Sequence, residues 1–104
     1  MSKINNDLLK KLLETFGPSG NEEAIRDVIR EEIKGYVDEI KVDALGNLIG
    51  IKKGQGKKIM VAGHMDEIGI MVTNIDENGF IRFTSIGGVS PFTELYQRVM
   101  FADG

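Results

Sequence analysis

The side chain in this sequence that is best suited to take part in chemistry is its single histidine, His64. It lies in residues 63–69, which read Gly-His-Met-Asp-Glu-Ile-Gly. In an extended backbone, residues two apart face the same way, so the His64 imidazole and the Asp66 carboxylate would share one side. A metal-bound histidine needs an acceptor for its second ring N–H, and a carboxylate fills that need. The spacing favours His64 as a metal ligand oriented by Asp66, although a lone histidine at a strand end also fits a structural role.

The number of available ligands limits what this chain does alone. A catalytic zinc takes three protein ligands and a two-metal site takes more, whereas the sequence has one histidine and no cysteine. Carboxylates would have to supply the rest. Glu67 receives no role, and Asp76 and Glu77 fall in a polar turn where a solvated loop is the simpler interpretation. We therefore expect an incomplete site and weak or absent metal binding by the 104 residues alone.

Three other motifs are interpreted as structural. Residues 74–85 superficially resemble a calcium loop, but the first position is Asn74, the twelfth is Ser85, and predicted strands flank the segment in place of helices. Residues 54–56, Gly-Gln-Gly, lack the third glycine and the following helix of a dinucleotide-binding turn. Ser19 lacks the Gly-x-Ser-x-Gly elbow of a nucleophile, and we predict that it caps a helix instead.

Composition excludes several classes of function. The net charge is −3 without a basic cluster, which argues against nucleic-acid binding. The absence of cysteine excludes disulfides, thiolate zinc sites and cysteine nucleophiles. The polar amino terminus lacks a targeting segment, and no apolar run approaches the roughly 20 residues of a membrane span. We expect a cytoplasmic protein.

Two helices are predicted ahead of the histidine. Apolar residues at helical spacing between positions 8 and 16 follow possible caps at Asn5 and Asn6, and Gly17-Pro18 should end this helix. Residues 19–22 read Ser-Gly-Asn-Glu, a capping-box pattern that predicts a second helix running until Gly35.

The remainder is predicted to be mainly strand. Residues 36–42 and 48–52 should form a hairpin, and residues 68–75 and 80–84 another, joined by a tight Asn-Gly turn. The apolar run 58–62 is typical of a strand buried on both faces and leads directly to His64. Residues 97–101 should begin a further strand. The pattern predicts an α/β fold of two helices followed by a mixed sheet with hairpins.

Several of these segments together resemble the glutamyl and deblocking aminopeptidases, a family of two-metal peptidases. The resemblance is carried, in order and spacing, by Phe16-Gly17-Pro18-Ser19-Gly20-Asn21-Glu22, Asp43-Ala44-Leu45-Gly46-Asn47-Leu48, Gly63-His64-Met65-Asp66-Glu67-Ile68-Gly69, Gly79-Phe80-Ile81, Gly87-Gly88 and Gln97-Arg98-Val99. It covers nearly the whole chain.

The resemblance implies the first third of a three-layer α/β/α exopeptidase. Residues 1–95 would belong to the catalytic domain and residues 96–104 would start an inserted β-rich domain. His64 matches the first metal ligand and Asp66 the residue that orients it, while the remaining ligands and the glutamate general base have no counterpart here. Tyr96 stands where relatives commonly have glycine. The complete enzyme would bind two zinc or cobalt ions and peptide substrates, and would form homo-oligomers.

We therefore expect a metallo-aminopeptidase fragment that is inactive alone and prone to self-association. Some relatives are named endoglucanase or cellulase, so a β-glucan hydrolase is one alternative. It lacks support, since such enzymes need two suitably spaced carboxylates across a sugar site, and no aromatic stacking platform is evident in a sequence without tryptophan. A non-catalytic interaction module is the other alternative.

Overall fold

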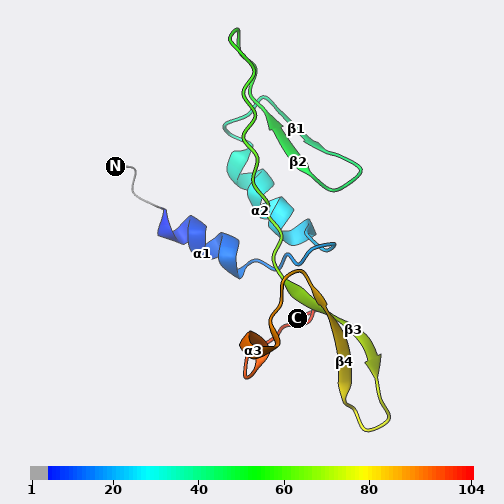
Figure 1. Cartoon of the computed structure of the whole chain (residues 1–104). Helices are drawn as coiled ribbons and strands as arrows, with labels where there is room; N and C mark the ends of the chain where they lie inside the picture. Colours follow the sequence, from blue (N-terminus) through cyan, green and yellow to red (C-terminus); the bar gives the residue numbers. More distant parts are fainter. Residues whose placement is uncertain (1–4) are drawn as a thin grey trace. The chain divides into compact units, whose positions relative to one another are not determined.

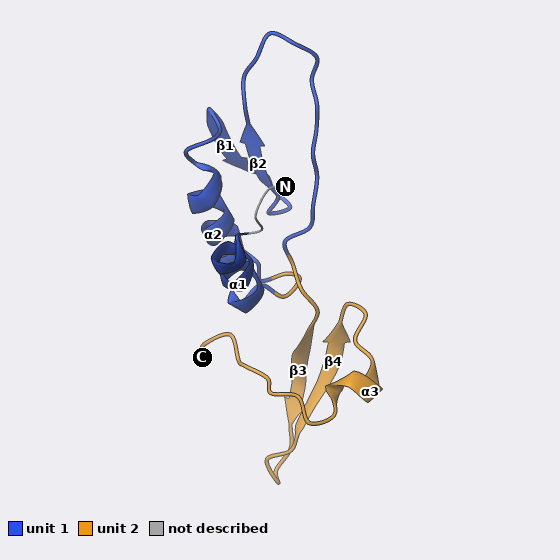
Figure 2. Cartoon of the chain, turned by 90° about the vertical axis from the view of Figure 1, so that its left-hand side faces the viewer, with its two compact units in different colours: residues 1–17, 21–65 blue, residues 18–20, 66–104 orange. Residues whose placement is uncertain are grey.

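The computed structural model describes residues 5–104 as a set of short helices and antiparallel hairpins (Figure 1). The elements are α1 (Asn6–Glu14), α2 (Glu23–Ile33), β1 (Glu39–Val42), β2 (Leu48–Ile51), β3 (Gly69–Ile75), β4 (Ile81–Ile86) and α3 (Pro91–Glu94). They divide into two compact units (Figure 2). Unit 1 comprises residues up to 17 and residues 21–65, and unit 2 comprises residues 18–20 and 66–104.

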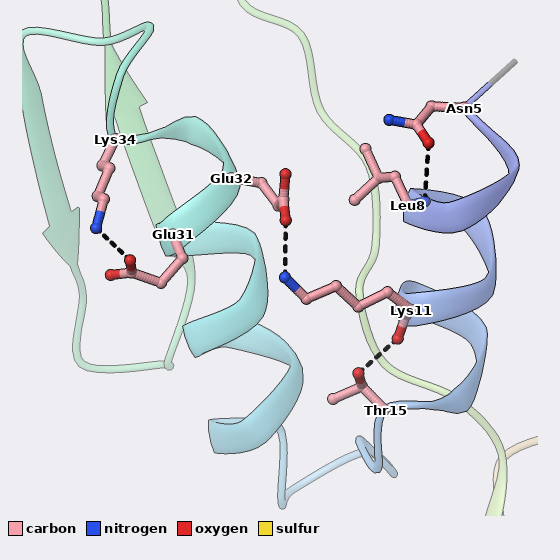
Figure 3. Close-up of polar contacts among 7 residues, drawn as sticks. All are labelled: Asn5, Leu8, Lys11, Thr15, Glu31, Glu32 and Lys34. Atoms are coloured by element: carbon pink, nitrogen blue, oxygen red, sulfur yellow. Dashed lines mark hydrogen bonds and ion pairs between the residues drawn. The ribbon is translucent and has the colours of Figure 1, made fainter.

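Side-chain caps set the limits of α1 in unit 1. Asn5 Oδ1 accepts a hydrogen bond from the Leu8 backbone N–H at 3.1 Å, which confirms Asn5 as the cap. The helix ends at Glu14, before the predicted Gly17-Pro18 stop, because its C-cap Thr15 is extended and the Thr15 Oγ1 donates to the Lys11 carbonyl at 2.6 Å. Lys11 Nζ also lies 2.8 Å from Glu32 Oε1 (Figure 3), so an ion pair joins α1 to α2.

The second helix packs against the first hairpin. β1 and β2 pair antiparallel, with Val42 opposite Leu48, as the sequence predicted. A Cβ on Gly50 of β2 would lie 3.2 Å from Ile33 Cδ1 of α2, so the glycine permits a close approach of helix and strand. Ile25 of α2 is 3% exposed and is the one buried hydrophobic side chain among residues 5–104.

An aspartate organises the turn of each hairpin. Asp43 Oδ1 accepts from the backbone N–H groups of Leu45 and Asn47, both at 2.9 Å, and Gly46 has φ +87°. Asn47 Nδ2 donates to Asp43 Oδ2 at 2.8 Å, and this hydrogen bond is the main reason that the pKa of Asp43 lies below its usual value. These bonds stabilise the turn through the aspartate side chain.

The hairpin of unit 2 repeats this arrangement. β3 and β4 pair antiparallel from Gly69 opposite Ile86, with a bulge near Val72. Asp76 Oδ1 accepts from the N–H groups of Asn78 at 3.0 Å and Phe80 at 2.9 Å. The predicted tight turn over residues 76–79 is confirmed, because the Gly79 N–H donates to the Asp76 carbonyl at 3.0 Å and Gly79 has φ +84°.

Two predicted strands are absent from residues 5–104. Residues 58–62 and 97–101 have no strand structure, because a strand needs a hydrogen-bonded neighbour and neither segment pairs with the two described sheets, β1–β2 and β3–β4. Ile59, Met60 and Val61 are 87%, 89% and 93% exposed. Ahead of the second segment, Tyr96 has φ +63°, which interrupts an extended run.

The chain leaves much of its surface uncovered. Its accessible surface is 9390 Å². A folded monomer of this size exposes about 5,800 Å², and even two separate globules of half the size would expose about 7,000 Å² together. Among residues 5–104, the helices are too short or too polar to cross a bilayer.

Candidate functional site

The histidine and the aspartate lie on an irregular segment that joins the two units. His64 is exposed near the end of unit 1, and Asp66 is half-buried at the start of the second part of unit 2. The segment becomes regular only at Gly69, where β3 begins. Their pairing is therefore an inference from their spacing in the sequence.

Asp66 is held by a residue far away in the sequence. Ser19 Oγ donates a hydrogen bond to Asp66 Oδ2 at 2.5 Å, in a partly buried position 47 residues distant. The predicted helix-capping role of Ser19 is wrong, because the N-cap residue of α2 is Glu22 and the helix has no side-chain cap bond. The Ser19 hydroxyl, which the capping-box pattern assigns to the start of α2, is instead bonded to the Asp66 carboxylate, an ionic acceptor.

The backbone of the same segment is bonded to the residue after Asp66. Pro18 and Glu67 form an isolated parallel bridge, in which the Ser19 N–H donates to the Glu67 carbonyl at 3.2 Å. A Cβ on Gly69 would lie 2.9 Å from Pro18 Cβ, closer than side-chain carbons approach one another. Glycine at position 69 therefore allows residues 18–20 to lie directly on the start of β3.

The donors present fit part of a metal site and not a complete one. Within residues 5–104, no three histidine, cysteine, aspartate or glutamate side chains are grouped so that they could hold an ion. Asp76, which the sequence offered as a spare carboxylate, holds its hairpin turn instead. His64 has the chemistry of a zinc or cobalt ligand and Asp66 that of its acceptor, so further ligands would have to come from other residues.

The sequence patterns missed Ser19 as a partner of this site. The signal that could have identified it is the joint occurrence of Gly-Pro-Ser-Gly at residues 17–20 and His-Met-Asp at residues 64–66. Neither motif alone indicates that the serine and the aspartate meet. The contact depends on the parallel bridge, which joins residues too far apart for local rules to predict.

Comparison with known proteins identifies the family. The sequence profile described as M42 glutamyl aminopeptidase matches residues 46–103. A protein of Acetivibrio thermocellus named "Putative aminopeptidase" is 65% identical over 94% of this chain and 30% of its own length. The chain thus spans about a third of the length of that relative.

Solved structures agree with the sequence match. A Thermotoga maritima structure named as an endoglucanase is 44% identical, with a TM-score of 0.75 over 81% of this chain and 28% of that one. A structure described as PhTET1-12s, a "dodecamer in the asymmetric unit", is 43% identical, with a TM-score of 0.73 over 86% of this chain and 27% of that one. The predicted α/β class and the predicted endoglucanase label among relatives are both confirmed. The profile covers more than half of the chain, and we conclude that this protein belongs to the M42 glutamyl aminopeptidase family.

Proposed function

We propose that this chain forms the N-terminal part of a metal-dependent aminopeptidase that hydrolyses N-terminal residues from peptides. The observation that carries the proposal is the family match over residues 46–103, which includes both His64 and Asp66. The likeness to a protein named for aminopeptidase activity extends over 94% of the chain. The 104 residues alone would be inactive, since they supply only part of the site.

Each of the two site residues has a distinct role in this proposal. His64 is a ligand of one of two divalent ions, zinc or cobalt, and Asp66 accepts the second ring N–H of His64 and so fixes its tautomer and direction. When bound, the two ions supply Lewis-acid activation of the peptide carbonyl and of a water. The remaining ligands and the glutamate general base come from residues outside this chain.

The proposal also covers the domain boundaries and the oligomeric state. Residues 1–95 belong to the catalytic domain, and residues 96–104 start an inserted β-rich domain. The complete protein is a homo-oligomer, which the solved relative described as a dodecamer supports. The uncovered apolar side chains are also what a chain that packs against further protein requires.

The two alternatives are less well supported. A β-glucan hydrolase is supported by the name given to one structural neighbour, and the sequence has no tryptophan to form a platform for sugar stacking. A stand-alone interaction module is disfavoured because the chain exposes far more surface than two independent globules would.

The test uses the full-length protein that contains this chain. We expect hydrolysis of aminoacyl p-nitroanilides that depends on zinc or cobalt, is lost with a chelator and is lost in His64→Ala. Glu67→Gln is the matched control, because it neutralises the neighbouring carboxylate that has no assigned role. Release of reducing sugar from β-glucan without any cleavage of peptides would overturn the proposal.

A further inference from the structure

We propose that Ser19 is a positioning residue of the metal site, holding the Asp66 carboxylate in the orientation from which it fixes the His64 imidazole. This inference rests on the proposed function, in which Asp66 orients His64. It assigns a role to the Gly-Pro-Ser-Gly segment at residues 17–20, which the family match and the proposed chemistry leave without one.

Two bonds fix Ser19 against the Asp66 segment. Its hydroxyl donates to Asp66 Oδ2 at 2.5 Å, and its backbone N–H donates to the Glu67 carbonyl at 3.2 Å. A side-chain bond alone would leave the serine backbone free to shift. With the backbone paired as well, the position of Oγ relative to Asp66 is set by the parallel bridge.

Two glycines next to this contact, Gly69 and Gly20, allow the backbone conformation that the contact requires. Gly69 lacks the Cβ that would stand 2.9 Å from Pro18 Cβ, and Gly20 has φ +90°, a conformation that side-chain-bearing residues rarely adopt. The chain therefore turns sharply just after Ser19. The Ser19 hydroxyl does not cap α2, which begins four residues later at Glu23 without a side-chain cap.

A carboxylate that orients a histidine needs such a second partner. The terminal torsion of an aspartate has a broad energy profile, so one hydrogen bond leaves the plane of the carboxylate poorly defined. A carboxylate has two oxygens with about four lone pairs, so acceptance from Ser19 at Oδ2 is compatible with acceptance from an imidazole N–H. The serine hydroxyl thus fixes the plane in which Asp66 meets its histidine.

The test is a titration of the full-length apoprotein with Co²⁺, followed by the visible absorption of the bound ion. Substitution of a residue that supports a metal ligand typically weakens affinity 10- to 100-fold, and we expect about tenfold for Ser19→Ala. Ser19→Thr keeps the hydroxyl and should retain near-native affinity. Ser85→Ala, at an exposed serine of β4 in the same unit, is the matched control and should leave affinity unchanged.

A double-mutant comparison separates positioning from general stability. If Ser19 acts through Asp66, adding Ser19→Ala to Asp66→Asn should weaken Co²⁺ affinity less than about twofold further. An equal further loss in that background, or an equal loss with Ser19→Thr, would show that Ser19 acts through general stability and would overturn the inference.

The same experiment distinguishes failure of this inference from failure of the proposed function. Native affinity in Ser19→Ala together with weakened affinity in Asp66→Asn overturns the role of Ser19 and leaves that of Asp66 standing. Native affinity in both His64→Ala and Asp66→Asn overturns the proposed metal site itself, and the role of Ser19 with it.

Discussion

Replacing Gly17 with alanine should loosen α2, because the new methyl group would enter the space of the most buried side chain. An ideal Cβ at position 17 lies 2.5 Å from Ile25 Cγ2 and 3.0 Å from Ile25 Cβ. Carbon atoms normally approach to about 3.5–4.0 Å, so a shift of roughly 1 Å is required. Ile25 is only 3% exposed and β-branched within a helix, and its χ1 is therefore restricted.

Because the side chain cannot rotate away, the backbone of residue 17 or the helix itself must move. Overpacking of this kind costs about 1–3 kcal/mol. That cost should appear as faster amide hydrogen exchange of residues 23–33, measured by mass spectrometry on the full-length protein, by about 5- to 150-fold for amides that exchange through opening of unit 1.

Gly35→Ala is the matched control for this measurement. Gly35 directly follows the C-cap of the same helix, its φ is not positive, and an added Cβ would meet nothing within 4 Å. Exchange of α2 should stay near native in this variant. Equal exchange in the two variants would refute the reasoning that Gly17 is required by the packing of Ile25.

Two further predictions concern single backbone and turn positions. Tyr96→Gly should raise the melting temperature by several degrees, because it relieves about 1–2 kcal/mol of backbone strain at φ +63°. The loss of packing should be small, since the Tyr96 ring is fully exposed. Tyr36→Gly is the control and should lower the melting temperature, because Tyr36 is exposed but has no positive φ. Asp43 has a depressed pKa in the folded chain, so its contribution to stability is present above its ordinary pKa of about 3.9 and is lost as the pH falls through the lowered value. Asn47→Ala should move the Asp43 titration, followed by NMR of its carboxyl carbon, toward the ordinary value, and an unmoved titration would contradict the assigned cause.

The elements that the sequence predicted correctly are those set by neighbours close in the chain. The Asn5 cap of α1, the limits of α2 near Gly35 and both hairpins follow from helical period, strand alternation and turn residues within a few positions. The Asp76 side chain accepts from two backbone N–H groups and so stabilises the turn that the Asn-Gly pair favours.

The candidate site was predictable only in part, for a physical reason. His64 and Asp66 are two residues apart, so chemistry and spacing single them out from the sequence, and their joint role stays a prediction. Ser19 was assigned to a capping box because Glu22 follows at the expected distance, and that local pattern competes with a carboxylate 47 residues away. Local rules cannot weigh a long-range ionic acceptor against a local backbone donor, so the serine was assigned to the wrong partner.

The apolar run at residues 58–62 shows most clearly that local sequence patterns do not reveal whether a long-range partner is present. Its composition predicts burial on both faces, yet Ile59, Met60 and Val61 are almost fully exposed. A strand has no internal backbone hydrogen bonds, so it is stabilised by hydrogen bonds to adjacent strands. Residues 5–104 provide no strand that pairs with residues 58–62. The prediction of burial and the observed exposure are compatible only if the neighbours come from further protein. Since this run leads directly into His64, the protein that covers it would also fix the direction from which the histidine enters the proposed metal site.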